Sequence, residues 1–337
     1  MKKLNLANVP TKIEKLDRLT KETGINIFIK RDDQTGSEWS GNKIRKLEFS
    51  VQEAIERGCN LLITCGGIQS NHCRATVSVA TKLGMKSAVL LRISEEPPVE
   101  GNYFLDMLLG SDVKFCTKEE YSNSRGEIMQ KMADEYAAKG YKPYIIPEGA
   151  SNGVGTQGYY NAMQEIVAQE KEMGVKFDTI VIATGSGGTC AGLNLANIVH
   201  GYGKRIVAMA VCDDVDYFQK KALDCCHECL PYLVKQGEIT EARAAELAAG
   251  MKQTDFEIND KYVGIGYALS RPEELEHIKR LAQLEGVVFD PVYTGKATYG
   301  IVNELAEGGN LRSAKNILFI HTGGLYGLFP VSRKFVF

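Results

Sequence analysis

The chain has 337 residues, which suffices for about two domains, each with its own buried core. Its 40 lysines and arginines nearly balance its 42 aspartates and glutamates, so the net charge of −2 gives no reason to expect nucleic acid or an anionic membrane as a partner. The longest apolar runs have only the length of strands, and no secretory signal is evident at the N-terminus. The nine cysteines, an odd number, favour reduced thiols. We therefore expect a cytoplasmic protein without a membrane span.

Short runs typical of strands alternate with helical patterns from residue 60 onward. A first series predicts strands at 60–64, 87–92, 113–116 and 144–147 and helices at 71–83, 103–109 and 126–138. A second series predicts helices at 156–173, 189–199, 273–284 and 296–305 and strands at 179–184, 205–211, 287–289 and 316–321. The segment 213–260 interrupts the alternation and is expected to form two polar helices, 217–236 and 241–251, without a clear strand between them.

This alternation predicts an α/β fold with two lobes, each a mainly parallel twisted sheet flanked by helices. The parallel crossovers should be right-handed. In such folds a ligand binds at the carboxyl ends of the strands, so we expect the site in the cleft between the lobes.

Lys43 is the first candidate for chemistry. It follows the small residues Ser40, Gly41 and Asn42 and opens a predicted helix. The positive end of a helix disfavours a protonated amine, so a desolvated lysine there could have a lowered pKa and act as a nucleophile or base. Local sequence alone favours the alternative, a solvated lysine beside Arg45 and Lys46.

Two glycine-containing turns lie between a predicted strand and a predicted helix. In the turn at 66–72, Ser70 and Asn71 are good N-cap residues whose free backbone N–H groups can hold a carboxylate or phosphate, although simple capping is the alternative. The second turn suits an anion because glycines allow close approach and hydroxyls add donors; it consists of Gly185, Ser186, Gly187, Gly188 and Thr189. Cys190 breaks the dinucleotide pattern, so a single phosphate group fits better and a nicotinamide-dependent oxidoreductase is disfavoured.

Two tyrosines and a cysteine cluster complete the candidates. Tyr293 lies in a strand-to-helix turn and Tyr267 in a glycine-containing loop, and packing is the alternative reading of both. The cluster 225–229 contains three cysteines and a histidine but lacks the second pair of ligands that a structural zinc site needs. We therefore expect no metal.

In this order the motifs resemble those of the D-cysteine desulfhydrase and 1-aminocyclopropane-1-carboxylate (ACC) deaminase family, pyridoxal 5'-phosphate enzymes of the tryptophan synthase β-like fold. The similarity covers nearly the whole chain and is carried by residues in the segments 27–33, 41–48, 67–71, 146–152, 185–189, 289–296 and 321–324. The resemblance implies a homodimer. It also implies a small domain at 48–153, with residues 1–47 and 154–337 forming the large cofactor-binding domain.

The resemblance assigns a role to each candidate residue. Lys43 would carry the cofactor covalently and move the α-proton of the substrate, Asn71 would hydrogen-bond the ring hydroxyl, and the turn at 185–189 would hold the phosphate. Ser70, Asn71 and His72 would bind the substrate carboxylate, and Ser70 would also take part in proton transfer. Tyr293 would stack on the pyridine ring, with Tyr267 approaching the substrate.

Thr294 points to one branch of the family. The deaminase branch has a glutamate there, which favours a protonated pyridine nitrogen and a stronger electron sink. A threonine should suffice to expel sulfide, so the first choice is an α,β-elimination that converts D-cysteine to pyruvate, ammonia and hydrogen sulfide. The alternatives are an ACC deaminase, an L-cysteate sulfo-lyase, which would need cationic groups that the motifs do not offer, and a noncatalytic two-lobed amino-acid-binding protein. Glu148 and Trp39 depart from the expected surroundings and could alter the preferred leaving group.

Overall fold

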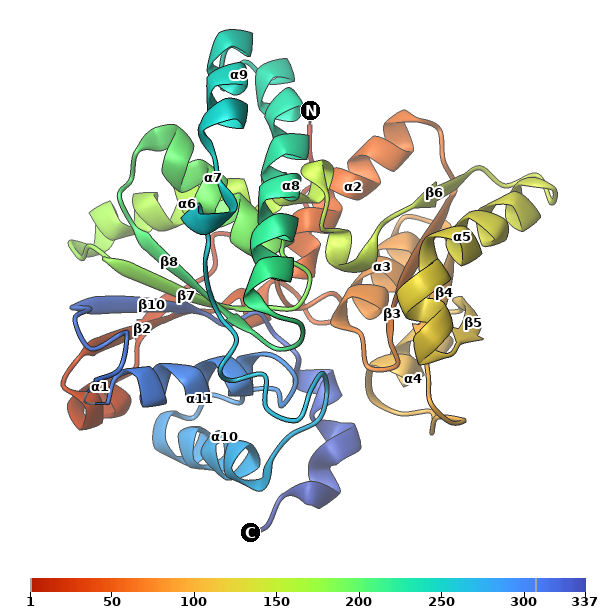
Figure 1. Ribbon diagram of the computed structural model, residues 1–337. Helices are drawn as coiled ribbons and strands as arrows, with labels where there is room; N and C mark the ends of the chain where they lie inside the picture. The colour runs from red at the N-terminus through yellow and green to blue at the C-terminus, as the bar shows by residue number, and fades with distance from the viewer. Residues whose placement is uncertain (1, 307) are drawn as a thin grey trace.

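The computed structural model describes residues 2–306 and 308–337 and contains two sheets (Figure 1). The larger sheet has the strand order β1-β2-β10-β7-β8-β9, and all of its neighbouring strands are parallel except β1 and β2. Its strands are β1 (Ile13–Lys15), β2 (Asn26–Lys30), β7 (Thr179–Thr184), β8 (Arg205–Ala210), β9 (Glu257–Asn259) and β10 (Asn316–Ile320).

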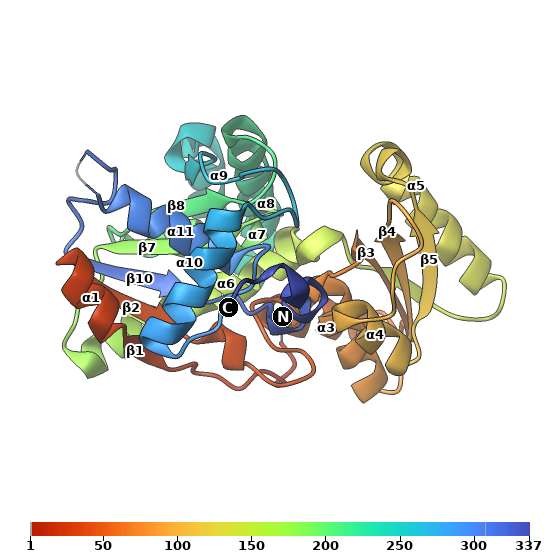
Figure 2. The ribbon, with the colours of Figure 1, turned by 90° about the horizontal axis from the view of Figure 1, so that it is seen from below.

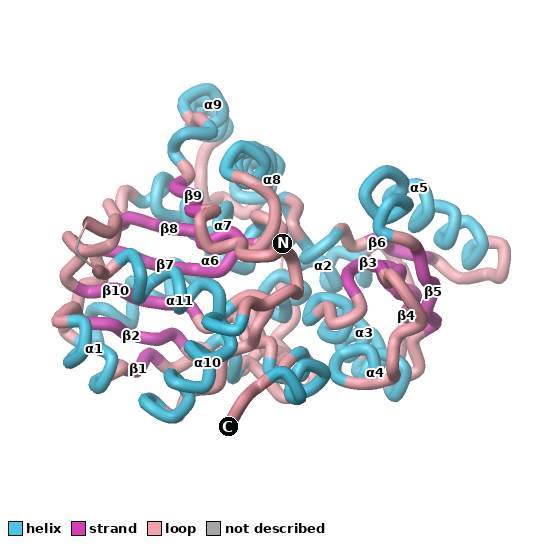
Figure 3. The backbone as a smooth tube through the Cα atoms, turned by 60° about the horizontal axis from the view of Figure 1, so that its bottom comes forward, coloured by secondary structure: helices cyan, strands magenta, loops and turns pink. Residues whose placement is uncertain are grey.

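The smaller sheet is entirely parallel and has the order β5-β4-β3-β6. Its strands are β3 (Leu61–Gly67), β4 (Lys86–Arg92), β5 (Asp112–Cys116) and β6 (Pro143–Ile145). Figure 2 shows the two sheets as separate parts of the molecule, and Figure 3 shows the strands of the larger sheet side by side.

Helices cover both faces of the larger sheet. On one face lie α6 (Gly153–Met173), α7 (Gly188–His200) and α8 (Val215–Lys235), and on the other α10 (Pro272–Glu285) and α11 (Thr294–Glu304) (Figure 1). Strand β7 contributes to the cores on both faces of the sheet. Ile180 and Ile182 pack on the side of α6, α7 and α8, and Val181 packs on the side of α10 and α11. Successive side chains of a strand point to opposite faces, so a continuous apolar run suits a sheet buried on both sides.

The smaller sheet is covered in the same way. Helices α2 (Lys43–Glu56) and α3 (Asn71–Lys82) pack on one face and α5 (Lys118–Ala137) on the other, while α4 (Gly101–Leu108) packs against α3. The remaining helices are α1 (Asp17–Thr23) and α9 (Glu241–Gly250). No helix among the described residues is long and apolar enough to cross a membrane, and all nine cysteines are free thiols.

Most predicted elements are present, with three corrections. The strand predicted at 287–289 is wrong: this segment is irregular, and the place beside β10 is taken by the unpredicted strand β2. Helix α5 begins eight residues before the predicted 126, because Thr117 and Glu120 form a capping box. Strand β9 follows α9 in a segment predicted to hold only helices. The domain boundary predicted after residue 47 falls inside α2, and the division into domains stays a prediction.

Candidate active site

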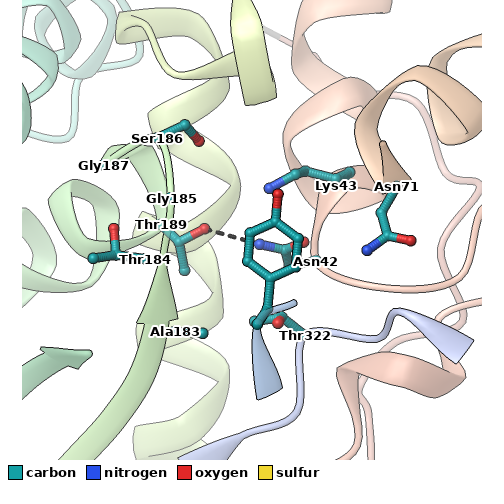
Figure 4. Close-up of a pocket in the computed structure, with 11 residues that line it drawn as sticks. Asn42, Lys43, Asn71, Ala183, Thr184, Gly185, Ser186, Gly187, Thr189 and Thr322 are labelled. Atoms are coloured by element: carbon teal, nitrogen blue, oxygen red, sulfur yellow. Dashed lines mark hydrogen bonds between the residues drawn. The ribbon is translucent and has the colours of Figure 1, made fainter. Parts of the chain in front are cut away.

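A pocket lies where β7 ends and where α2, α3, α7 and α11 begin. Figure 4 shows Lys43 and Asn71 on one side of it and Ser186 and Thr189 on the other. Its lining consists of Asn42, Lys43, Asn71, Ala183, Thr184, Gly185, Ser186, Gly187, Thr189, Tyr293 and Thr322. The pocket lies at the carboxyl end of a parallel strand, the position predicted from the sequence.

Lys43 is held at the start of α2 by the turn that precedes it. Gly41 has a φ of +106°, and a Cβ there would lie 2.6 Å from the carbonyl oxygen of Thr322, so only glycine fits. The next residue, Asn42, donates its N–H to that same oxygen at 3.1 Å and its side-chain amide to the Thr189 hydroxyl at 3.1 Å. These contacts fix the position of Lys43 relative to the glycine loop.

The amine of Lys43 has an unusual environment for a cation. Its Nζ lies 6.0 Å from the centroid of the Tyr293 ring, and no carboxylate of the described residues forms an ion pair with it. Burial lowers the pKa of Lys43 to about 8, and the more distant charge of Glu148 opposes this shift. A substantial fraction of the amine is therefore neutral near pH 7.5, which a nucleophile or base requires.

The loop at 185–189 leads from β7 into α7 and can hold an anion. Gly187 has a φ of +81°, and the following N–H, that of Gly188, donates to the hydroxyl of Ser151 at 3.2 Å. That hydroxyl in turn donates to the hydroxyl of Ser186 at 2.9 Å. The first N–H groups of a helix have no acceptor within the helix, so α7 presents donors and the positive end of its dipole to the pocket.

Lys46 strengthens this anion site, and the sequence analysis named it only as a neighbour of Lys43. Its side chain is fully buried and donates to the carbonyl of Gly149 at 3.0 Å and to the Ser151 hydroxyl at 3.3 Å. Burial, and then the charge of Lys43, places the pKa of Lys46 well below its usual value. Within the described chain no carboxylate pairs with it.

Helix α3 brings Ser70, Asn71 and His72 to the same region. The Ser70 hydroxyl caps the helix by accepting the N–H of Cys73 at 3.2 Å, which confirms the capping interpretation. Only Asn71 of the three lines the pocket. The His72 ring is buried with its Nε2 at 2.8 Å from the hydroxyl of Thr64, and burial holds its pKa well below the usual value. Its contribution to an anion site is therefore its backbone N–H rather than a charged ring.

Tyr293 and Tyr267 form a pair at the edge of the pocket. Their hydroxyl oxygens are 2.7 Å apart and their rings meet edge to face at 5.9 Å. Burial raises the pKa of both hydroxyls, so both keep their protons at neutral pH. Thr294 does not line the pocket: its hydroxyl is fully buried, donates to the Asp290 carboxylate at 2.7 Å and accepts the Asp290 N–H at 2.8 Å.

Two charged residues stand beside this tyrosine pair. Glu148 accepts the hydroxyl of Tyr121 at 2.8 Å and lies 3.9 Å from Arg125. Arg92, at the end of β4, stacks on Tyr121 and Tyr267 with its guanidinium carbon 5.1 and 5.3 Å from the ring centroids. The ion pairs of residues 2–306 and 308–337 do not include Arg92. No sequence motif marks Arg92, and only the pairing of β3 with β4 brings it near Gly67.

The arrangement combines a partly neutral lysine, an anion site with a buried lysine beside it, and an aromatic wall. The lysine can attack an aldehyde or ketone and can exchange a proton with a carbon acid beside it. The anion site fits a phosphate group.

Comparisons with known proteins agree with this chemistry. The family model described as pyridoxal-phosphate dependent enzyme matches residues 4–323. The chain is 41% identical over 333 residues (96% of this chain, 79% of the relative) to the mitochondrial bifunctional D-cysteine desulfhydrase/1-aminocyclopropane-1-carboxylate deaminase of Arabidopsis thaliana. It is 37% identical over 332 residues (97% and 95%) to D-cysteine desulfhydrase of Klebsiella pneumoniae. A crystal structure of an ACC deaminase homologue has a TM-score of 0.86 at 35% identity and covers 99% of this chain and 95% of its own. These findings confirm the family resemblance and the α/β fold expected from the sequence.

Proposed function

This chain belongs to the family of pyridoxal-phosphate-dependent enzymes, and on that premise we propose that it is a lyase that eliminates the β-substituent of a small amino acid. The first candidate substrate is D-cysteine, because the names of the relatives from Arabidopsis thaliana and Klebsiella pneumoniae include D-cysteine desulfhydrase. The observation that supports this most is Lys43, a buried amine without a carboxylate partner among the described residues, opposite the 185–189 loop.

The residues around the pocket fit pyridoxal phosphate. Its phosphate is an anion, and the 185–189 loop offers the N–H groups at the start of α7, with the buried amine of Lys46 beside them. The buried hydroxyl of Thr184, also on the lining, has no partner within the described chain. A Cβ on Gly185 would lie 2.9 Å from the Tyr293 ring, so glycine leaves room between the loop and the ring. When bound, the cofactor supplies an electron sink for the carbon that loses its proton.

The residues of this chain carry out the remaining steps. Lys43 holds the cofactor, and its Nζ then takes the proton from the substrate α-carbon. The N–H groups at the start of α3, with Ser70 beside them, bind the substrate carboxylate. The hydroxyls of Tyr267 and Tyr293 face the substituent. The Cβ–S bond breaks with its electron pair on sulfur, and the 2-aminoacrylate that is released takes up water to give pyruvate and ammonia.

Titration of the loaded protein with D-cysteine tests the proposal. We expect the visible absorption band of the cofactor to change and equal amounts of sulfide and pyruvate to appear. ACC in a parallel assay tests the deaminase alternative, whose product would be 2-oxobutanoate. A cofactor band without sulfide or pyruvate would contradict D-cysteine as the substrate, and the absence of a band after addition of pyridoxal phosphate would contradict the whole proposal.

A second candidate substrate is an amino acid with an anionic β-substituent, such as the sulfonate of L-cysteate. The guanidinium of Arg92 favours it, because it lies against Tyr267 with no carboxylate partner among the described residues. The charge of Glu148 opposes it. Sulfite release from L-cysteate by the wild type, lost in Arg92→Met, would establish this candidate, and equal D-cysteine turnover in both proteins would serve as the control.

We also propose a homodimer in the cytoplasm with a small domain formed by residues 48–153. The free thiols are compatible with a reducing compartment. The exposed apolar side chains of α4, namely Phe104, Met107 and Leu108, are of the kind that a subunit interface buries. Sedimentation equilibrium that gives the mass of one chain would contradict the dimer.

A further inference from the structure

Asn71 reaches the pocket with one end of its side-chain amide and contacts another asparagine with the other end. Its Oδ1 accepts a hydrogen bond from Nδ2 of Asn102 at 3.0 Å. In Figure 4 the amide nitrogen of Asn71 lies on the side of Asn42 and Lys43, and the oxygen lies on the far side. The pocket therefore faces a donor at this position, and a turn of the amide by 180° would replace it with an acceptor.

The orientation of Asn102 is fixed from two directions. Its Oδ1 accepts Nε of Arg74 at 3.1 Å, and its Nδ2 also donates to the carbonyl of Gln69 at 3.0 Å. A guanidinium can only donate and a backbone carbonyl can only accept. If the Asn102 amide turned by 180°, its N–H₂ would therefore face the N–H of Arg74, and its oxygen would face the carbonyl oxygen of Gln69. Asn102 is fully buried, so water cannot relieve such a conflict.

Arg74, the donor at the start of this chain of bonds, is itself held firmly. It is fully buried, and its two terminal nitrogens donate to the carbonyls of Glu38 at 2.7 Å and Ser40 at 3.1 Å. Those carbonyls belong to the loop that leads to Lys43. Burial lowers the pKa of Arg74 to about 10, so it stays protonated and remains a donor at neutral pH. The same arginine thus ties the loop before Lys43 to the helix that carries Asn71.

We propose that Asn102 is a positioning residue that holds the Asn71 amide with its N–H₂ toward the pocket, where it donates to an acceptor oxygen of the bound cofactor. This inference rests on the proposed function, because it requires a cofactor beside Lys43. Asn102 acts only through Asn71 and touches no reacting atom. Its effect is to keep one donor permanently aimed at the ligand, without the cost of ordering the amide when the ligand binds.

The variant that tests this is Asn102→Asp, which has nearly the same shape. Its carboxylate still accepts from Arg74 but cannot donate, so Asn71 turns its own N–H₂ toward Asp and presents its oxygen to the pocket. We expect the affinity for pyridoxal phosphate, measured by absorbance titration of the apoprotein, to fall by about 10-fold or more. The visible absorption maximum of the bound cofactor should also shift. Asn197→Asp, which alters a similar amide bonded to the carbonyl of Lys204, should leave both unchanged.

A double-mutant cycle that combines Asn102→Asp with Asn71→Ala separates this inference from the proposed function. If Asn102 works through Asn71, then Asn102→Asp has no further effect on cofactor affinity in the Asn71→Ala background. Wild-type affinity and spectrum in Asn102→Asp, or the same loss in both backgrounds, would overturn the inference. Failure of the wild type to bind the cofactor would instead overturn the proposed function. If circular dichroism shows Asn102→Asp to be unfolded, Asn102→Ala takes its place in the same cycle, because it too removes the donor.

Discussion

The first turn of α2 carries buried basic side chains of two kinds. Arg45 faces the larger sheet and forms ion pairs with Asp32 at 2.8 Å and Glu165 at 2.9 Å. Lys43 lines the pocket, Lys46 lies beside the 185–189 loop with its Nζ 3.3 Å from the Ser151 hydroxyl, and no carboxylate of the described residues pairs with either. The three residues belong to one short stretch of helix, and their sequence context alone does not distinguish them.

The surroundings of Arg45 explain why it is structural. Asp32 is fully buried and also accepts the hydroxyl of Tyr159 at 2.5 Å, while Glu165 accepts Nζ of Lys30 at 2.6 Å. Burial alone would raise the pKa of Asp32, but the charges of Arg45 and Lys30 outweigh it and lower the pKa to about 2. This network joins α2 to β2 and α6, and each of its charges has an opposite charge beside it.

Arg45 has carboxylate partners and the two lysines have none, and this difference indicates on which side of α2 a ligand binds. Burying an amine without an opposite charge beside it disfavours its charged form and costs free energy, so such a residue persists where another requirement outweighs that cost. On the pocket side the requirement is an amine that can lose its proton and a second amine that can donate toward a phosphate.

Lys43→Ala should have the largest effect, because it removes both the attachment of the cofactor and the base. We expect the rate of sulfide release to fall by roughly 10³- to 10⁴-fold or more. Steady-state assays with added pyridoxal phosphate measure this, and Lys235→Ala, on the exposed end of α8, is the control. Activity within a few-fold of the wild type would rule out Lys43 as the catalytic lysine.

Asp32→Asn should instead act on stability, because it leaves Arg45 and Lys30 without a fully buried partner. We expect the free energy of unfolding to fall by about 3–5 kcal/mol in denaturant titrations at pH 7. Since the folded pKa of about 2 lies below the usual 3.8, the contribution of Asp32 is complete above pH 4 and is lost as the pH falls toward 2. The free energy of unfolding of the variant should therefore change less than that of the wild type as the pH falls from 4 toward 2. An unchanged free energy of unfolding would mean that the network is not structural.

Lys46→Met should act on cofactor binding and not reduce stability. Removing a buried amine without a carboxylate partner should leave the free energy of unfolding of the apoprotein unchanged or raise it. The affinity for pyridoxal phosphate should fall roughly 10- to 100-fold, because a charge-assisted hydrogen bond to the phosphate is lost. Titration with pyridoxal, which lacks the phosphate, is the control and should show little difference between variant and wild type. Equal loss for both ligands would place Lys46 outside the phosphate site.

The pH dependence of cofactor attachment gives the smallest expected change. The rate at which the apoprotein binds pyridoxal phosphate covalently should rise as Lys43 loses its proton, with a midpoint near pH 8 rather than near 10.5. In Glu148→Gln the carboxylate that supports the protonated amine is gone, so the midpoint should move to lower pH. A midpoint above pH 10 in the wild type would show that burial does not lower the pKa of this amine.

Local patterns predicted much of the fold and the pocket. The apolar run of β7, the glycines that follow it and the start of α7 stand together in the sequence, so the 185–189 loop could be placed without any structure. The turn before Lys43 was recognised for the same reason. The motifs then identified the family, although single motifs had reasonable alternatives in capping or packing.

Long-range contacts account for what was missed. Arg92 and Asn102 lie outside the motifs, and they reach the site because β4 pairs with β3 and α4 packs on α3. Strand β2 was not predicted, and its place in the sheet depends on pairing with β10, which lies almost 300 residues later in the chain. Whether a buried lysine has a carboxylate partner also depends on residues far away in the chain, so Lys46 could not be separated from Arg45 by sequence alone.

The most direct test of the account is to locate the cofactor on the protein. Borohydride reduction of the wild-type protein loaded with pyridoxal phosphate, followed by digestion and mass spectrometry of the peptides, identifies the lysine that carries it. We predict the added mass on Lys43 alone. The added mass on Lys46 or on another lysine, or no added mass at all, would contradict the assignment of Lys43 as the lysine that carries the cofactor.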